Sequence, residues 1–222
     1  MALDKTKTDY NLGLDVRKVL IDAGVETPMK DFDQSDKDKY MLIMENIYQI
    51  MEKLGLDMDN DSLSETPKRI AKMYLNEIFW GLDYRNFPKI SVIENKMQYQ
   101  NMLLERHIRV NSTCEHHFIP IMGEAFVAYI PNKKVLGLSK INRIVEFFCR
   151  RPQVQERLVE QIFHALSYIL DTDDVAVLIK AEHTCVKLRG IEDVNSDTIT
   201  SRLGGVFFEG SLRNEFYQSL QL

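Results

Sequence analysis

The sequence lacks any long apolar run, and it has only three cysteines and one tryptophan in 222 residues. No segment approaches the ~20 apolar residues that a membrane-spanning helix needs. The first ten residues carry acids and no apolar core, so neither a secretion signal nor a transit peptide is expected. Few, scattered cysteines argue against a disulfide framework and favour a reducing compartment, so we expect a cytoplasmic protein.

The composition is otherwise that of an ordinary globular protein. Hydrophobic residues make up 45% and charged residues 27%, which excludes a disordered or fibrous chain. The formal net charge of -5 argues against a nucleic-acid coat or a polybasic membrane binder. We therefore expect neither nucleic acid nor a membrane as a partner, although a local basic pocket is compatible with this charge.

The spacing of apolar residues divides the chain into helical and strand-like segments. Gly55 and Gly81 supply stop signals for the first two helices. Helical periodicity predicts helices over 35–54, 66–78, 139–148 and 154–169, and a short amphipathic helix at the end of the chain. Alternating or continuous apolar runs predict strands near 90–95, 102–110, 123–130, 174–183, after Gly190 and near 197–208.

The order of these segments indicates an α+β fold. Two helices precede the first strands, and two more separate the central strands from the later ones, which favours antiparallel pairing over a βαβ repeat. We expect residues 1–35 to form a mobile arm or a loosely attached helix. Residues 36–96 would form a helical region and 97–222 a sheet region, with 36–222 working as one functional unit.

Two short clusters of cysteine and histidine suggest a metal site. Cys114 and His117 are three residues apart, so one turn of chain can present both to one ion, and Cys185 in the second cluster could complete the set. Thiolate and imidazole donors favour Zn²⁺. Three protein ligands leave a fourth position for water, whose pKa falls from ~15.7 to ~7 on zinc.

The spacing also allows a closed structural site, and isolated buried cysteines are usually inert. Such a site would hold zinc with four protein ligands: Cys114, His116 or His117, Cys149 and Cys185. Cys149 fits it poorly, because it ends an amphipathic helix and resembles a small core residue.

Two further histidines accompany the candidate ligands. Adjacent side chains of an extended chain face opposite ways, so His116 would be free to act as an acid or base if His117 binds the metal. His183 and Cys185 are two residues apart on an expected strand and would share a face. A second histidine is therefore expected near the ion.

Cations that could bind a phosphorylated substrate occur at three places. A helix N-terminus attracts anions, and one of these places is the expected helix start at Ser139. The cations are Lys140 and Arg143 at that start, Arg69 and Lys72 three residues apart on another helix, and Arg189 after the second cluster. Gln155 and Glu156 place an amide beside a carboxylate, a pair that can recognise the donor edge of guanine. For any one of these residues, a solvated helix face is the commoner explanation.

Taken together, these stretches resemble the GTP cyclohydrolase I family in content, order and spacing. The resemblance covers roughly residues 36–222, and no single stretch has to carry it. The matching stretches are Glu65–Tyr74, Ser112–Phe118, Gly137–Arg143, Arg151–Arg157, His183–Gly190 and Leu203–Gly205.

The resemblance implies zinc-dependent hydrolysis of GTP to 7,8-dihydroneopterin triphosphate and formate, the first step of folate or pterin biosynthesis. It implies the tunnelling fold, an antiparallel sheet with two layered helices, assembled into a toroidal homodecamer. By motif position it assigns zinc binding to Cys114, His117 and Cys185, and proton transfer to His116 and His183. It assigns guanine binding to Gln155 and Glu156. The ribose and triphosphate would contact Ser139, Lys140, Arg143 and Arg189, together with Arg69 and Lys72 of a neighbouring chain.

Two other functions fit part of the pattern. A nitrile reductase of the same fold would use a cysteine nucleophile with NADPH and no zinc, and the paired cysteine and histidine ligands argue against it. A non-catalytic nucleotide-binding protein with structural zinc would not need His116 and His183. Zinc content, nicotinamide binding and GTP turnover distinguish the three.

Overall fold

The computed structural model describes residues 3–30 and 34–221. Residues 1–2 and 31–33 of the expected N-terminal arm lie outside the described residues. The chain divides into two compact units, one of residues 1–3 and 28–80, the other of residues 4–27 and 81–222. This grouping differs from the boundaries expected at residues 35 and 96, and the division into functional regions stays a prediction.

The smaller unit is a pair of helices, α2 (Asp36–Lys53) and α3 (Thr66–Met73). The Ser35 hydroxyl caps α2 by accepting from the Asp38 N–H, and Gly55 follows the helix with φ +81°. Both predicted helices are confirmed. The expected continuation of the second one to Ile78 is a single π-helical turn, η2 (Tyr74–Ile78).

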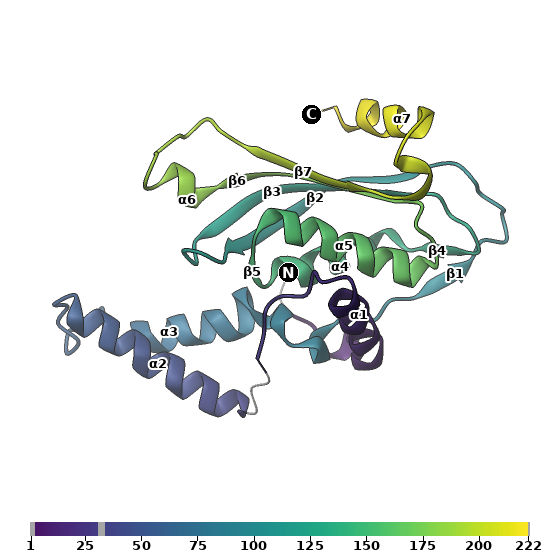
Figure 1. The fold of residues 1–222 in the computed structure, drawn as a ribbon. Helices are drawn as coiled ribbons and strands as arrows, with labels where there is room; N and C mark the ends of the chain where they lie inside the picture. Colours follow the sequence, from purple (N-terminus) through teal and green to yellow (C-terminus); the bar gives the residue numbers. More distant parts are fainter. Residues whose placement is uncertain (1–2, 31–33, 222) are drawn as a thin grey trace. The chain divides into compact units, whose positions relative to one another are not determined.

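The larger unit is built on a five-stranded sheet of order β5-β2-β3-β6-β7 (Figure 1). Its pairs are antiparallel, except that β5 runs parallel to the end of β2. A separate two-stranded sheet pairs β1 with β4. The strands are β1 (Val92–Glu94), β2 (Leu103–Cys114), β3 (Pro120–Tyr129), β4 (Lys134–Leu136), β5 (Pro152–Gln153), β6 (Val175–His183) and β7 (Thr198–Leu203).

Helices cover both faces of this sheet (Figure 1). On one face lie α4 (Leu138–Cys149) and α5 (Gln155–Leu170), whose apolar stripes are buried. On the other face, η5 (Gly205–Phe207) and α7 (Ser211–Leu220) pack Phe207 and Phe216 against Ala176 and Leu178 of β6. Because β6 is buried on both faces, it is apolar at consecutive positions. The α+β class is confirmed, and the sheet is mixed because of β5.

The N-terminal part of the larger unit is firmly packed. It contains η1 (Lys5–Lys7) and α1 (Tyr10–Asp22); later in the chain, η3 (Trp80–Leu82) begins at the last residue of the smaller unit and η4 (Tyr84–Asn86) follows in the larger one. Val16 and Leu20 of α1 are fully buried, so the expectation of a loosely attached helix among residues 1–35 is wrong for α1. The sequence around α1 is mostly polar and gives no sign that the helix packs against the rest of the unit. Its packing rests on few apolar side chains, among them Val16 and Leu20, which lie one helical turn apart.

Two sequence expectations fail near residue 185. β6 ends at His183, and a short helical turn, α6 (Thr184–Lys187), follows it. His183 and Cys185 therefore do not share a strand face. The described residues 188–197 contain no strand, although an apolar pattern after Gly190 predicts one. Leu188 and Ile191 are instead exposed, so their apolar character does not reflect burial in this sheet.

Candidate metal centre

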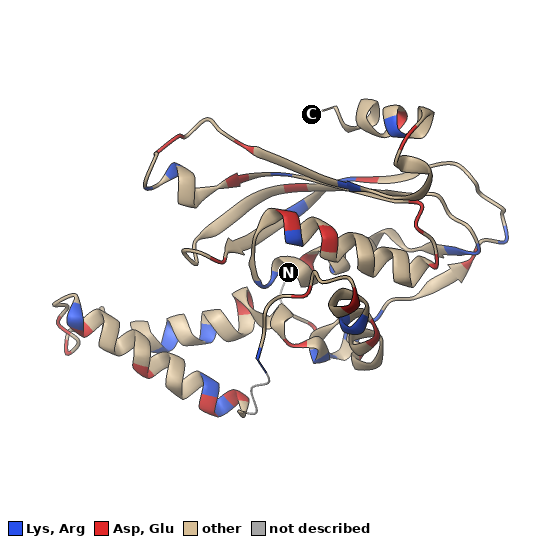
Figure 2. Ribbon diagram, viewed as in Figure 1, with Lys and Arg blue, Asp and Glu red and all other residues tan. Residues whose placement is uncertain are grey.

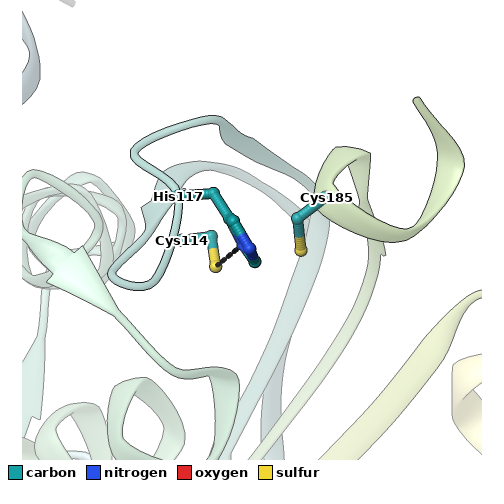
Figure 3. A group of neighbouring side chains, drawn as sticks. All are labelled: Cys114, His117 and Cys185. Atoms are coloured by element: carbon teal, nitrogen blue, oxygen red, sulfur yellow. Dashed lines mark hydrogen bonds between the residues drawn. The ribbon is translucent and has the colours of Figure 1, made fainter. Parts of the chain in front are cut away.

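Three side chains from the segments at the ends of two strands, β2 and β6, converge on one point at the same end of the sheet (Figure 3). The donor atoms of Cys114, His117 and Cys185 all lie within 4.8 Å of one another. Cys114 is the last residue of β2 and is buried, His117 follows in an exposed turn, and Cys185 lies on α6. Cys114 Sγ lies 4.0 Å from His117 Nδ1.

The donor set fits a zinc ion. Tetrahedral bonds of ~2.3 Å to sulfur and ~2.0 Å to nitrogen place donors roughly 3.5–3.8 Å apart, so small side-chain rotations suffice here. Two thiols and an imidazole are also ligands of the softness that zinc accepts. Burial and the neighbouring Cys114 raise the pKa of the Cys185 thiol, which a bound cation would oppose by stabilising the thiolate.

Among the described residues, Cys149 does not supply the fourth ligand of a closed structural site. Cys149 is buried at the end of α4 and does not belong to the group of converging donors. Burial raises the pKa of its thiol to about 12, so it stays protonated at neutral pH. The structure therefore favours three protein ligands and gives Cys149 a place in the core.

Comparison with known proteins decides the family. The family model described as GTP cyclohydrolase I matches residues 43–221. The chain belongs to the GTP cyclohydrolase I family. A protein named GTP cyclohydrolase 1 from Haemophilus influenzae (strain ATCC 51907 / DSM 11121 / KW20 / Rd) is 53% identical over 209 residues, covering 94% of this chain and 96% of that protein. One of the same name from Mannheimia succiniciproducens is 54% identical over 202 residues, covering 90% and 93%.

Arg189 and His116 also lie beside the cluster. Arg189 Nη1 is 2.8 Å from His117 Nε2, and since a guanidinium only donates, that nitrogen accepts. His117 thus turns Nδ1 toward the Cys114 thiol. His116 Nδ1 is 3.7 Å from Cys114 Sγ, so the two adjacent histidines do not face opposite ways as expected. The reason is that residues 115–117 form a turn rather than extended chain.

A second group joins His183 to Gln155. His183 Nε2 lies 2.8 Å from Gln155 Oε1 at the first turn of α5. The Gln155 amide nitrogen donates to the carbonyls of Ile179 and Thr198 and to the Thr200 hydroxyl. Both ends of this side chain are therefore engaged within the chain. The guanine contact that the resemblance assigns to it would need this network to open.

Burial lowers the pKa of His183, and the Glu156 carboxylate partly opposes that shift. Glu156 is exposed at the first turn of α5, as a residue that contacts a ligand has to be. The charge of Glu156 acts on His183, so the residue expected to bind guanine lies near a residue expected to transfer protons.

The other candidate ligand residues lie on two helices. Ser139, Lys140 and Arg143 occupy the first two turns of α4, and the Lys140 ammonium donates to the Lys89 carbonyl at 3.3 Å. Arg69 and Lys72 are exposed on α3, in the smaller unit. Their part in substrate binding stays a prediction.

One ion pair beside the candidate metal ligands, between Arg157 and Glu115, is not predicted from the sequence. Arg157 Nη1 and Nη2 donate to Glu115 Oε2 at 2.8 and 2.6 Å. Both residues lie in stretches that carry the family resemblance, which is the only sequence signal for them. Because Glu115 directly follows Cys114, this pair links α5 to the turn that carries two candidate metal ligands.

Proposed function

We propose that this chain hydrolyses GTP to 7,8-dihydroneopterin triphosphate and formate, with one zinc ion held by Cys114, His117 and Cys185. The convergence of these three donors in a member of the GTP cyclohydrolase I family is the observation that carries the proposal. When bound, the ion would supply an activated water at neutral pH, because zinc lowers the pKa of water to ~7. The downstream product would be a folate or another pterin.

The chain's own residues would recognise the base and move protons. Glu156 would accept from the guanine N1–H and amino group. His116, exposed beside Cys114, would protonate N7 and so make C8 a better electrophile. Water adds to C8, the C8–N9 bond opens to a formamide, and a second water releases formate. His183 and Ser139 would then move protons while the ribose rearranges and the ring recloses with loss of water.

The triphosphate would serve as an anchor and is not cleaved. Binding energy from a remote part of a substrate can orient its reacting centre. Lys140, Arg143 and Arg189 would bind the phosphates, with Arg69 and Lys72 reaching in from a neighbouring copy. In a chain of net charge -5, this grouping of cations supports an anionic ligand.

We also propose the tunnelling fold and a toroidal homodecamer. The antiparallel sheet with α4 and α5 on one face supports the fold. Figure 2 shows the charges of α2 gathered mainly toward its two ends. Between them, Met41, Leu42, Tyr48 and Ile50 are exposed, and Met51 is the residue of α2 that is buried. Such an apolar surface supports association with another copy.

The described helices include none with the length and apolar character needed to cross a membrane. Cys114, Cys149 and Cys185 are free thiols, which supports a reducing compartment such as the cytoplasm.

GTP turnover by the purified protein tests the proposal. Formate and the pterin would be followed by mass spectrometry with the metal intact, after chelation, and after zinc is restored. We expect both products, loss of both on chelation, and recovery with zinc. GTP binding without turnover, in an assembled and zinc-loaded preparation, would instead favour a non-catalytic nucleotide-binding protein.

A further inference from the structure

The two segments that carry the candidate metal ligands do not pair with each other. Cys114 ends β2 and Cys185 follows β6, and β3 lies between these strands in the sheet. Cys114 is still part of β2, whereas His117 lies in the turn after that strand and Cys185 lies on α6 beyond the end of β6. Strand pairing therefore joins the two segments only through β3, and contacts made beyond the strand ends contribute to the separation of the two thiols.

The first turn of α5 contacts both segments. Its Arg157 binds Glu115 with two charge-assisted hydrogen bonds, and the two side chains are only 14% and 28% exposed. Such bonds are stronger than neutral ones, and partial burial limits screening by water. The Glu115 N–H also donates to the Gln153 carbonyl at 3.0 Å, just before α5. The turn after Cys114 is thus fixed to α5 by a side chain and to β5, which directly precedes α5, by the backbone.

Gln155, on the same helical turn, contacts the other segment. Its side chain is 1% exposed, and three acceptors on β6 and β7 fix the direction of its amide nitrogen. The amide oxygen consequently faces His183, two residues before Cys185. One helical turn therefore contacts a neighbour of each cysteine ligand.

We propose that this turn of α5 is a clamp that sets the separation of the two halves of the metal site, and that Arg157 is a positioning residue for the Cys114–His117 turn. The proposal rests on the proposed function in that the three donors bind zinc. Residues outside the ligand set that orient ligands typically change metal affinity by ~10–100-fold when replaced. Arg157 would act in this way through Glu115, without touching the ion.

The test measures zinc affinity of the full-length protein by competition with a chromophoric chelator. We expect Arg157→Gln and Glu115→Gln each to weaken zinc binding ~10–100-fold, and the double variant to be no weaker than the worse single one, because both remove the same link. Arg157→Lys keeps the positive charge but cannot donate two parallel hydrogen bonds to Glu115, so we expect a zinc affinity between those of the wild type and Arg157→Gln. Excess zinc should restore GTP turnover in Arg157→Gln at least in part.

Arg202→Gln is the matched control. Arg202 Nε lies 3.2 Å from Glu160 Oε2 and so ties α5 to β7 by an ion pair remote in sequence from the ligands. We expect this variant to change thermal stability but not zinc affinity. Wild-type affinity in both Arg157→Gln and Glu115→Gln, or equal weakening in Arg202→Gln, would overturn the clamp. Should Arg157→Gln fail to fold, Arg157→Lys and Glu115→Gln decide the matter.

Failure of the clamp and failure of the proposed function give different results. A wild-type protein that binds no zinc, or that binds zinc but does not turn over GTP, contradicts the proposed function. A wild-type protein that binds zinc, with Arg157 and Glu115 variants that bind it equally well, contradicts the clamp alone.

Discussion

At the scale of single residues, the proposed zinc ligands and the proposed proton carriers predict different effects of substitution. Cys185 offers a donor atom, whereas His116 is largely exposed and lies outside the group of three donors. We therefore expect Cys185→Ala to lose zinc and ring opening together. His116→Ala should retain zinc but lose turnover by ~10²–10⁴-fold, the usual contribution of a general acid or base.

Zinc content by elemental analysis and GTP turnover, measured on the same preparations, check this pair of variants. Normal turnover in His116→Ala would remove His116 from the mechanism. Loss of zinc in His116→Ala would instead assign the residue to the ligand set, alongside the cysteine thiol that it approaches.

His164, outside the metal centre, gives a prediction about pH. Burial lowers its pKa, Arg202 acts in the same direction, and the carboxylates of Glu160 and Asp173 oppose them. The unfolded chain therefore takes up a proton at higher pH than the folded one. The resulting stability is present above the ordinary histidine pKa of ~6.5 and is lost as the pH falls through the lowered folded value.

We expect His164→Gln to flatten the fall in the free energy of unfolding between neutral pH and about pH 5.5. Urea unfolding of both proteins at matched concentration measures the two slopes, and contributions from the other titrating groups cancel in the comparison. Parallel slopes would show that His164 has the same pKa in both states.

At the scale of elements, the sequence predicts long periodic segments well and short ones poorly. The spacing of apolar residues locates α2, α4 and α5 to within a residue or two, because each has a continuous apolar stripe. It misses β4 and β5, which have three and two residues and no period of their own. Their pairing is decided by the elements beside them.

The same limit applies to the metal centre. Cys114 and His117 are recognisable because they are three positions apart, Cys185 in the second cluster is a candidate to complete the set, and the family resemblance assigns all three to zinc. Arg157 and Glu115 are 42 residues apart, and no local pattern joins an acid in a turn to an arginine on a later helix. Contacts of this kind become visible only when the fold brings both segments together.

The attachment of the segment after α1 depends on a buried arginine. Arg151 is fully buried, donates to Glu26 at 2.9 Å, and stacks against the rings of Tyr84, Phe147 and Phe148. Removing one partner of a buried ion pair costs about 3–5 kcal/mol, because the other charge stays buried without a counter-charge. We expect Arg151→Met to lower the free energy of unfolding by about that amount.

Urea unfolding at fixed protomer concentration measures this loss, since assembly makes stability depend on concentration. The double variant Arg151→Met with Glu26→Gln should recover part of it by removing the orphaned charge. A double variant as unstable as the sum of the singles would show that packing of the arginine, rather than its charge, stabilises this region.

At the scale of the whole molecule, the exposed apolar residues of α2 make assembly testable. Ile50 is 56% exposed, in a helix whose charges lie mainly toward its ends. If the surface around Ile50 packs on another copy, Ile50→Lys buries a charge there and should shift the protein to smaller species in sedimentation velocity. Because Arg69 and Lys72 would reach a neighbour's substrate, GTP turnover should fall in parallel.

The neighbouring Gln49→Lys is the control, because it adds the same charge at an exposed polar position of the same helix. It should leave both assembly and turnover near the wild-type values. Assembly that is unchanged in Ile50→Lys would place the interface elsewhere on the molecule. Smaller species with full turnover would mean instead that each active site is complete within the smaller assembly, so that Arg69 and Lys72 act within it or not at all.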